Sequence, residues 1–257
     1  MNSSRIYSEI SNGIGELILN KPEKRNALSS DMWGAIPELI AEFQENRDVK
    51  TVIIHGGTAG AFAAGADISE FESIYATAES AANSADLISN ALTSIAECRK
   101  PVIAAIDGGG VSVAPAADIR VAGEGSRFAV TPAKLGLVYP VDDTRRLIEA
   151  VGVPAAKDIL LTGRLFLTEE AFRLGLVTRM VAAGEALATA RTLAEQIGQN
   201  SLWSHGATKR SFKAVNEGWT DKTAEAKALF LESFSNEDFE EGYTAFLGKR
   251  LAKFTYR

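Results

Sequence analysis

Two glycine-flanked stretches, well separated in the chain, have the residue types needed to aim backbone N–H groups at one carbonyl oxygen. The first is Ala61–Ile68, with the sequence AFAAGADI, and the second is Gly108–Gly110. Because glycine lacks a Cβ atom, an oxygen can approach its main chain closely. N–H donors that are fixed before reaction stabilise the negative charge that develops on that oxygen. We therefore expect these two loops to form an oxyanion hole.

Strands and helices must hold these loops, and the hydrophobic pattern predicts where they lie. Three apolar, mostly β-branched runs predict strands: Ile14–Leu19, Thr51–His55 and Val102–Ile106. Residues Ser30 to Asn46 predict a helix that Ser29 or Ser30 could cap and that Pro37 would bend or interrupt. Val111–Ala117 is small and apolar enough to be a buried helix. Strands that alternate with helices indicate an α/β fold.

From about residue 200 onward the pattern becomes helical and charged. The runs Ala207–Asn216, Thr223–Ser235 and Glu240–Lys253 contain no strand-like stretch. We therefore divide the chain into a core, residues 1–200, and a helical C-terminal region, residues 201–257. No low-complexity linker separates the two, so we expect the C-terminal region to pack against the core.

The composition is that of a globular protein without a nucleic-acid or membrane partner. The 257 residues are 46% hydrophobic, which is enough for a large core, and the net charge of −6 argues against a basic nucleic-acid-binding face. No apolar run is long enough to span a bilayer. The sole cysteine, Cys98, cannot form an internal disulfide, so we expect a cytoplasmic protein. With only His55 and His205, neither a metal site nor a Ser-His-Asp triad is indicated.

Several segments in register resemble the crotonase superfamily, the enoyl-CoA hydratase/isomerase family. Asn20–Leu28 resembles its N-P-x-x-x-N-A-L segment, and Phe62–Asp67 resembles its F-x-A-G-x-D loop. The remaining landmarks follow in the family's order: Lys100–Ala105, Gly108–Gly110, Ala117–Arg120, Leu135–Leu137, Leu161–Arg164, Ala171–Val177 and Phe246–Arg250. The resemblance covers nearly the whole chain.

This resemblance implies a fold, an assembly and a class of substrate. The family's α/β fold is a ClpP-like spiral of ββα units with a helical C-terminal trimerisation region, so a homotrimer or a dimer of trimers is implied. The substrate is an acyl-CoA thioester, and no cofactor is implied beyond the coenzyme A of the substrate. By the same resemblance, the two oxyanion donors are the N–H groups of Ala66 and Gly109.

The resemblance also places coenzyme A along the chain. The Ala64 carbonyl would face the adenine amino group, and Lys24 or Arg25 would lie near the phosphates. Phe246 and Lys249 match the C-terminal F-x-x-K through which a neighbouring subunit contacts the adenosine end. The complete set of residues expected to contact coenzyme A is Lys24, Arg25, Ala27, Ala64, Asp67, Ile68, Phe246 and Lys249.

The two glutamates that hydratases use as acid and base are absent from this chain. The first position is Ser112 and the second is Pro132. A serine hydroxyl is too weak an acid to replace a carboxyl group, and proline has no side-chain proton. We therefore expect ordinary hydratase activity to be weak or absent. From Lys100 to Ser112 the chain is also shorter than is usual in the family, which would move the second N–H donor.

Thr131–Tyr139 (TPAKLGLVY) instead resembles the methylmalonyl-CoA decarboxylase branch. Loss of CO2 from a malonyl-type thioester leaves an enolate that two N–H donors can hold, and it requires no strong base. Tyr139 could orient the departing carboxylate through its phenol O–H. Our first prediction is therefore decarboxylation of a short malonyl-type acyl-CoA.

Two other activities remain open. An isomerase or weak hydratase could use Asp143, Asp142 or Glu70 as its base, although Asp142 and Asp143 could equally be first-turn residues of a helix, where the helix dipole favours acidic side chains. The chain could also be an acyl-CoA-binding protein without catalytic activity, since both glutamates are lost. Such a protein would bind thioesters without turnover.

Overall fold

A six-stranded sheet forms the framework of the computed structural model, which describes residues 4–111 and 113–255. The strand order is β1-β2-β3-β4-β5-β8; β1 and β2 form an antiparallel hairpin, and every other neighbouring pair is parallel. The strands are β1 Ile6–Ser11, β2 Ile14–Leu19, β3 Thr51–His55, β4 Val102–Ile106, β5 Ile119–Gly123 and β8 Arg179–Val181. A separate two-stranded ribbon pairs β6 Arg127–Phe128 with β7 Phe166–Leu167. The three strands predicted from the sequence are confirmed.

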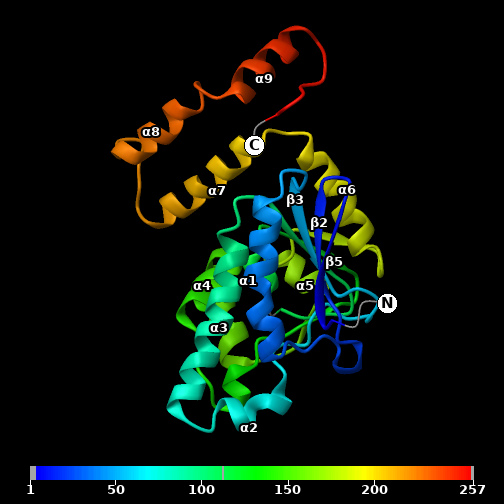
Figure 1. Cartoon of the computed structure of the whole chain (residues 1–257). Helices are drawn as coiled ribbons and strands as arrows, with labels where there is room; N and C mark the ends of the chain where they lie inside the picture. The colour runs from blue at the N-terminus through cyan, green and yellow to red at the C-terminus, as the bar shows by residue number, and fades with distance from the viewer. Residues whose placement is uncertain (1–3, 112, 256–257) are drawn as a thin grey trace.

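Helices cover both faces of this sheet, which confirms the α/β class (Figure 1). They are α1 Ser30–Glu45, α2 Phe71–Ile74, α3 Ala78–Ala96, α4 Val141–Thr162, α5 Thr168–Arg173, α6 Ala186–Gly198, α7 Leu202–Asn216, α8 Ala224–Glu232 and α9 Glu237–Leu247. Four short 3-10 helices connect them: η1 Pro22–Lys24, η2 Ile68–Glu70, η3 Ala114–Ala116 and η4 Pro132–Leu135. The described helices are too short or too polar to cross a membrane.

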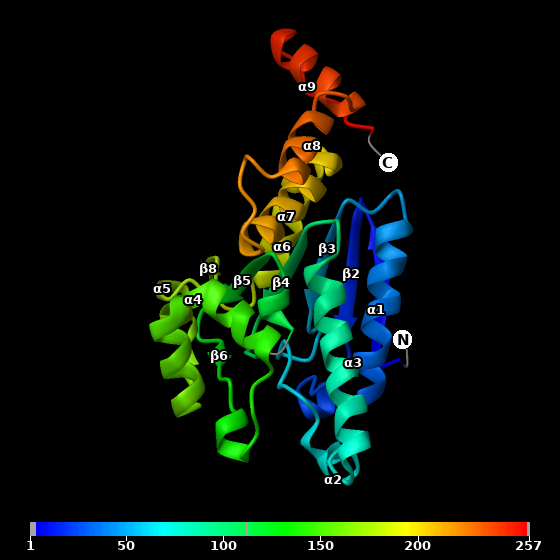
Figure 2. The ribbon, with the colours of Figure 1, turned by 90° about the vertical axis from the view of Figure 1, so that its left-hand side faces the viewer.

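The strand side chains alternate between two hydrophobic layers. Val52 and Ile54 of β3 face the larger core, which α1 and α3 cover, whereas Ile53 faces a smaller core that α6 covers. Figure 2 shows α1 and α3 side by side on one face of the sheet. Because both faces are buried, the parallel strands are continuously apolar rather than half polar. The loops that follow the carboxyl ends of β3 and β4 carry the two predicted donors.

The segment predicted as a buried helix, Val111–Ala117, is mostly not helical. Only the 3-10 turn Ala114–Ala116 forms there, and Ala117 is already extended, with φ −75° and ψ 152°. Pro115 lies in the first turn and cannot donate a backbone hydrogen bond. The expected helix over Val111–Ala117 was therefore wrong, because a short turn directly joins the glycine loop to β5. Ser112 lies outside the described residues.

The C-terminal region contacts the core through α7, and Phe254 and Thr255 line a cavity together with Asp48 and Lys50 of the core. Helices α8 and α9 project away from the core (Figures 1 and 2). The ammonium of Lys209 in α7 lies 2.7 Å from Oδ2 of Asp118, and the ammonium of Lys213 lies 2.7 Å from Oε1 of Glu97. These two ion pairs join α7 to the core. The helices that were predicted there do form, at α7, α8 and α9.

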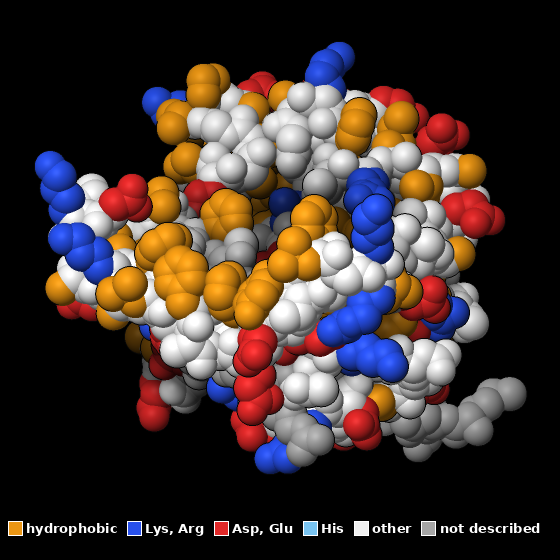
Figure 3. Space-filling model, turned by 90° about the horizontal axis from the view of Figure 1, so that it is seen from above, with side chains coloured by type: hydrophobic (Ala, Val, Ile, Leu, Met, Phe, Trp, Pro, Cys, Tyr) orange, Lys and Arg blue, Asp and Glu red, His pale blue; other side chains and the backbone are white. Residues whose placement is uncertain are grey.

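The projecting helices expose an aromatic row. Phe230, Phe234, Phe239 and Tyr243 contact one another in sequence, edge-to-face or tilted, with ring centroids 5.1 to 5.5 Å apart, and all four are exposed. Figure 3, seen from this end of the molecule, shows hydrophobic side chains running across the surface. A hydrophobic surface of this kind commonly marks a protein–protein contact.

A buried ionic cluster fastens α6 to the sheet close to the first donor loop. Arg191 of α6 binds both carboxylate oxygens of Glu16 in β2, at 2.7 and 2.8 Å. His55, the last residue of β3, shares the same carboxylate at 3.1 Å. The N–H of Gly57 donates to Nδ1 of His55, so the hydrogen-bond pattern puts the ring proton on Nε2, facing Glu16.

This cluster predicts a stability loss in acid. Burial alone would raise the pKa of Glu16, but the hydrogen bonds from His55 and Arg191 outweigh it and lower the pKa to about 2. A depressed carboxyl pKa stabilises the fold above its unfolded value of 4.5, and this contribution is lost as the pH falls towards 2. Glu16→Gln should therefore cost roughly 3 kcal/mol at pH 7. Urea unfolding should show that the difference in the free energy of unfolding between wild type and Glu16→Gln becomes smaller from pH 5 to pH 3. A difference that does not depend on pH would contradict the lowered pKa of Glu16.

Candidate active site

The structure brings the two predicted glycine loops into direct contact. The N–H groups of Phe62 and Ala63 both donate to the carbonyl oxygen of Gly109, at 3.2 Å. Gly110 has φ +127°, and a Cβ atom there would overlap the carbonyl oxygen of Ala63. Gly108 meets the carbonyl of Gly60 in the same way. These glycines are therefore required because two backbones pack against each other without room for side chains.

Neighbouring segments hold each donor in place. Leu28 donates to the carbonyl of Gly65 at 2.8 Å and accepts from the N–H of Asp67 at 2.9 Å, so the Ala66 N–H points away from Leu28. Gly109 forms a similar parallel bridge with Arg127. Within the described part of the chain, the N–H groups of Ala66 and Gly109 find no acceptor. These two N–H groups are therefore the candidates to bind a ligand oxygen.

The shortened loop keeps its contact with the first donor loop. One residue, Asp107, separates the end of β4 from Gly108. The side chain of Asp107 accepts from the backbone of Gly184 at 2.9 Å and of Ala186 at 3.3 Å. The loop is thus anchored to the start of α6 on one side and to Phe62–Ala63 on the other.

Asp67, which we expect to contact coenzyme A, lies at the centre of an ion cluster. The buried Lys21 ammonium lies 2.6 Å from Oδ2 of Asp67, and Lys24 lies 3.0 Å from the same oxygen. The Asp67 carboxylate also accepts from the N–H and the hydroxyl of Ser69. The hydrogen bond from Lys21 and those from Ser69 and Lys24 hold the pKa of Asp67 well below its usual range, although burial opposes them. Two lysines on one carboxylate leave a net positive charge beside Ala66.

The other residues expected near coenzyme A differ in accessibility. Lys24 is about 41% exposed, and Arg25 is exposed, so both side chains are open to solvent. The Arg25 carbonyl accepts from the N–H of Ala64 at 3.0 Å. The Ala64 carbonyl accepts no hydrogen bond from any described residue, and Ile68 is 64% exposed. Ala27 is buried, and its side chain lies within the protein interior.

The segment from Pro132 to Arg146, in which we expect the acid or base, contains a buried ion pair. Pro132, at the second glutamate position, starts the 3-10 turn η4. Asp143 and Arg146, in the first turns of α4, are both buried and joined at 2.8 Å. A further N–H of Arg146 reaches the hydroxyl of Thr93 in α3 at 3.3 Å.

Tyr139 is largely enclosed beside this pair. Burial, and then the charge of Asp143, raise the pKa of the Tyr139 phenol. Burial likewise raises the pKa of Asp143 in spite of the attraction of Arg146. The phenol therefore keeps its proton near neutral pH and can donate a hydrogen bond, and the carboxyl has a perturbed pKa of the kind common at functional sites.

The remaining acidic candidates have structural partners. Asp142 lies on the exposed side of α4, 3.6 Å from Arg145. Glu70 accepts from both the N–H and the hydroxyl of Ser30, at 2.8 Å each, and so caps the first turn of α1 in place of the side chain of Ser29. α1 then runs unbroken through Pro37.

Phe246 and Lys249 lie at the end of α9, far from the donor loops. α9 and α2, which directly follows η2, lie at opposite ends of the molecule in both ribbon views. Phe246 is 83% exposed. These two residues therefore do not reach the site of their own chain.

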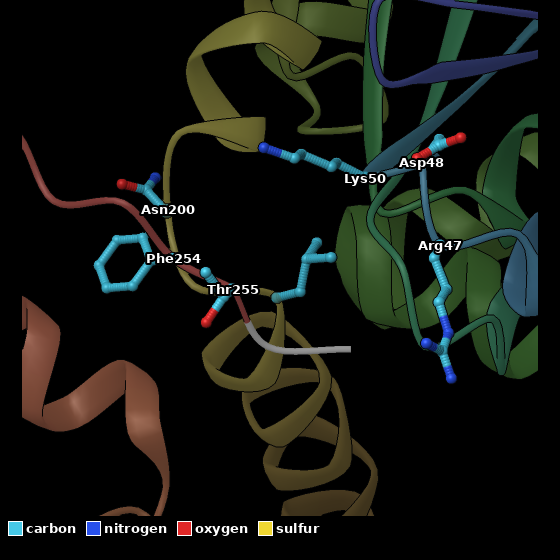
Figure 4. Close-up of a pocket in the computed structure, with 7 residues that line it drawn as sticks. Arg47, Asp48, Lys50, Asn200, Phe254 and Thr255 are labelled. Carbon is cyan, nitrogen blue, oxygen red and sulfur yellow. The ribbon is translucent and has the colours of Figure 1, made fainter.

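One cavity of about 390 Å³ lies away from this chemistry (Figure 4). It is lined by Arg47, Asp48, Lys50, Asn200, Leu202, Phe254 and Thr255. It lies at the amino end of β3, whereas the donor loops follow the carboxyl ends of β3 and β4. The described residues contain no group of three or more His, Cys, Asp or Glu side chains that could hold a metal ion.

Comparison with known proteins decides the family. The enoyl-CoA hydratase/isomerase family model matches residues 9–257. The chain belongs to this family. A probable enoyl-CoA hydratase of Mycobacterium leprae is 36% identical over 252 residues, which is 95% of each chain. The short-chain-enoyl-CoA hydratase of Clostridium acetobutylicum is 33% identical over 259 residues, covering 97% of each.

A solved structure confirms that the fold is that of an enoyl-CoA hydratase/isomerase family member. The crystal structure of a family protein from Hyphomonas neptunium superposes with a TM-score of 0.97 and 59% identity over 99% of each chain. The crotonase-type α/β fold expected from the motifs is thereby confirmed. An acyl-CoA enzyme of this family is the activity that the comparisons support.

Sequence reasoning missed several residues that build the site. Lys21 and Thr93 gave no signal, because Asp67 and Arg146, which they contact, lie 46 and 53 positions away in the chain. Asn26 did have a sequence signal, since it is the asparagine of the N-A-L segment. That motif alone does not say what the side chain of Asn26 binds.

Proposed function

We propose that this family member processes a short acyl-CoA by forming a thioester enolate between the N–H groups of Ala66 and Gly109. The observation that supports this proposal best is the hydrogen-bonded contact of the two glycine loops, in which neither donor has a partner among the described residues. Preorganised donors of this kind favour the charged transition state over the neutral thioester.

Our first choice of reaction is decarboxylation of a malonyl-type thioester. The bond from the α-carbon to the carboxylate breaks, CO2 leaves, and the electron pair moves into the enolate that the two N–H groups hold. The Tyr139 phenol orients the departing carboxylate through its O–H, and a proton from water is then added to the α-carbon. The raised pKa of Tyr139 supports its role as an O–H donor. Pro132 offers no proton, which disfavours hydration even though the curated relatives named above are hydratases.

Isomerisation of a 3-enoyl thioester is the second candidate, because Asp143 is buried and its pKa is raised. A single carboxylate can move one proton between two carbons. The ion pair with Arg146 weighs against this reaction, since it stabilises the carboxylate and lowers its basicity. Binding of acyl-CoA without turnover remains the alternative to catalysis.

Product masses after incubation with methylmalonyl-, 2-enoyl- and 3-enoyl-CoA distinguish these reactions. Decarboxylation predicts the loss of CO2 from the malonyl-type thioester only. Hydration predicts the gain of one water by the 2-enoyl thioester, and isomerisation predicts an unchanged mass but a new chromatographic position. If all three thioesters bind and none is converted, the enzyme proposal is wrong and the binding function takes its place.

Tyr139→Phe tests the role of the phenol. Removing only the hydroxyl should lower kcat for decarboxylation about 100-fold, because the carboxylate is no longer held in the orientation from which CO2 leaves. The affinity for coenzyme A and the melting temperature should change little. Asp143→Asn is the companion variant, because it should abolish isomerisation if Asp143 is the base. Unchanged turnover by Tyr139→Phe would remove Tyr139 from the mechanism.

We also propose that the chain assembles as a trimer or a dimer of trimers. Its support is the exposed aromatic row on α8 and α9, together with the distance of Phe246 and Lys249 from their own site. In such an assembly these two residues would contact the adenosine end of coenzyme A in a neighbouring subunit. Light scattering should give three or six times the mass of the chain, and a monomer would rule out the cross-subunit contact. The lone, buried Cys98 supports a cytoplasmic location.

A further inference from the structure

Asn26 is the buried residue that connects the segment before α1 with both donor loops. Its side chain is fully buried. The Oδ1 atom accepts from the N–H of Lys21 at 2.7 Å. The Nδ2 atom lies within hydrogen-bond distance of three carbonyl oxygens, those of Gly56 at 3.0 Å, Ala61 at 2.8 Å and Phe62 at 3.2 Å.

These contacts fix the orientation of the amide. If oxygen and nitrogen were exchanged, an oxygen would face three carbonyl oxygens, and an N–H would face the N–H of Lys21. The backbone of Asn26 has φ +56°, a left-handed conformation that asparagine adopts more readily than most residues. Position 26 therefore requires both a left-handed backbone and a side chain with a donor and an acceptor.

The contacts of Asn26 extend to both oxyanion donors. Gly56 and Phe62 lie at the two ends of the loop that follows β3, and this loop leads to Ala66 four residues later. Phe62 in turn donates to the carbonyl of Gly109, so the peptide held by Asn26 also touches the second donor residue. One amide thus limits the movement of both loops relative to each other.

We propose that Asn26 is a positioning residue that sets the separation of the Ala66 and Gly109 N–H groups and thereby controls the rate of the chemical step. This inference rests on the proposed oxyanion-hole function of the same site. Asn26 does not touch the thioester. A misplacement of about 1 Å is enough to reduce a rate 100-fold.

Asn26→Gly removes the side chain while keeping the left-handed backbone accessible. We expect kcat to fall about 100-fold on whichever thioester the wild type converts. The dissociation constant of free coenzyme A should stay within about twofold of wild type, because the amide does not touch the ligand. Asn26→Ser, which retains one hydroxyl for the carbonyl oxygens, should recover part of the rate. It is also the variant to measure if Asn26→Gly does not fold.

Asn12→Gly is the matched control. Asn12 is also left-handed, with φ +51°, but lies exposed in the β1–β2 hairpin turn. The same substitution there should leave kcat within twofold of wild type. If a folded Asn26 variant keeps kcat within about threefold of wild type, Asn26 only stabilises the fold and the proposal is wrong.

Hydrogen exchange separates this proposal from the proposed function. The amides of Phe62 and Ala63 should exchange at least tenfold faster in Asn26→Gly than in Asn12→Gly, whether or not the wild type converts a thioester. If this exchange is faster but the wild type converts nothing, the proposed catalysis fails, and with it the control of a chemical step. If the wild type is active and exchange at both amides is unchanged, only the role of Asn26 is wrong.

Discussion

Gly110→Ala is expected to lower kcat at least 100-fold. A Cβ atom at this position overlaps the carbonyl oxygen of Ala63, which is backbone and cannot rotate away. The loops must therefore separate, and the Gly109 N–H moves relative to the Ala66 N–H. Loss of one oxyanion-hole donor typically costs 100- to 1000-fold in kcat. The affinity for free coenzyme A should change much less, because the adenosine end does not depend on this contact.

Gly125→Ala is the control for backbone strain alone. Gly125 also has a positive φ, +72°, but a Cβ atom there meets nothing within 4 Å. Gly125→Ala should lower the free energy of unfolding by about 1 kcal/mol and leave kcat unchanged. Steady-state kinetics and thermal unfolding of both variants check the prediction. Near-normal kcat in folded Gly110→Ala would show that the loops need not touch for activity.

Asp67→Asn is expected to have the largest effect on stability. The substitution leaves the Lys21 ammonium, which is only 4% exposed, without its anion. Breaking a buried pair by removing one partner typically costs 3–5 kcal/mol, of the order of a third or more of the total stability of a domain. Because the pKa of Asp67 is well below its usual range, its contribution should persist in wild type down to pH 4 and fade only in stronger acid.

Two further variants test this explanation. Asp31→Asn removes an exposed pair with Arg5, 3.5 Å apart, and should cost less than 1 kcal/mol. Lys21→Met combined with Asp67→Asn removes both charges and should recover much of the loss. Urea unfolding measures all three. If the double variant is no more stable than Asp67→Asn, the buried ammonium is not the cause.

Some of the site was predictable from sequence because its constraints are local. Glycine is necessary at 108 and 110 because the backbones approach closely there, and the three apolar, mostly β-branched runs are typical of strands in a buried sheet. The family motifs placed Ala66 and Gly109 in two loops, and the structure shows those loops in contact.

Other features depended on pairings that no local pattern contains. No sequence pattern shows that Asp67 pairs with Lys21, 46 positions earlier. Glu70 looked like a candidate base, yet it caps α1 across 40 positions. The short turn at Ala114–Ala116 was mistaken for a helix because small apolar residues suit both, and Pro115 decided between them.

The infrared band of a thioester carbonyl labelled with carbon-13 tests the central claim most directly. A saturated acyl-CoA that cannot react would be bound to the wild type and to Gly110→Ala, and its carbonyl stretch compared with that in water. Two fixed N–H donors should polarise the carbonyl, so the band should shift to lower frequency in wild type and return towards the solution value in the variant. A band at the solution frequency in bound wild type would mean that Ala66 and Gly109 do not hold the thioester oxygen.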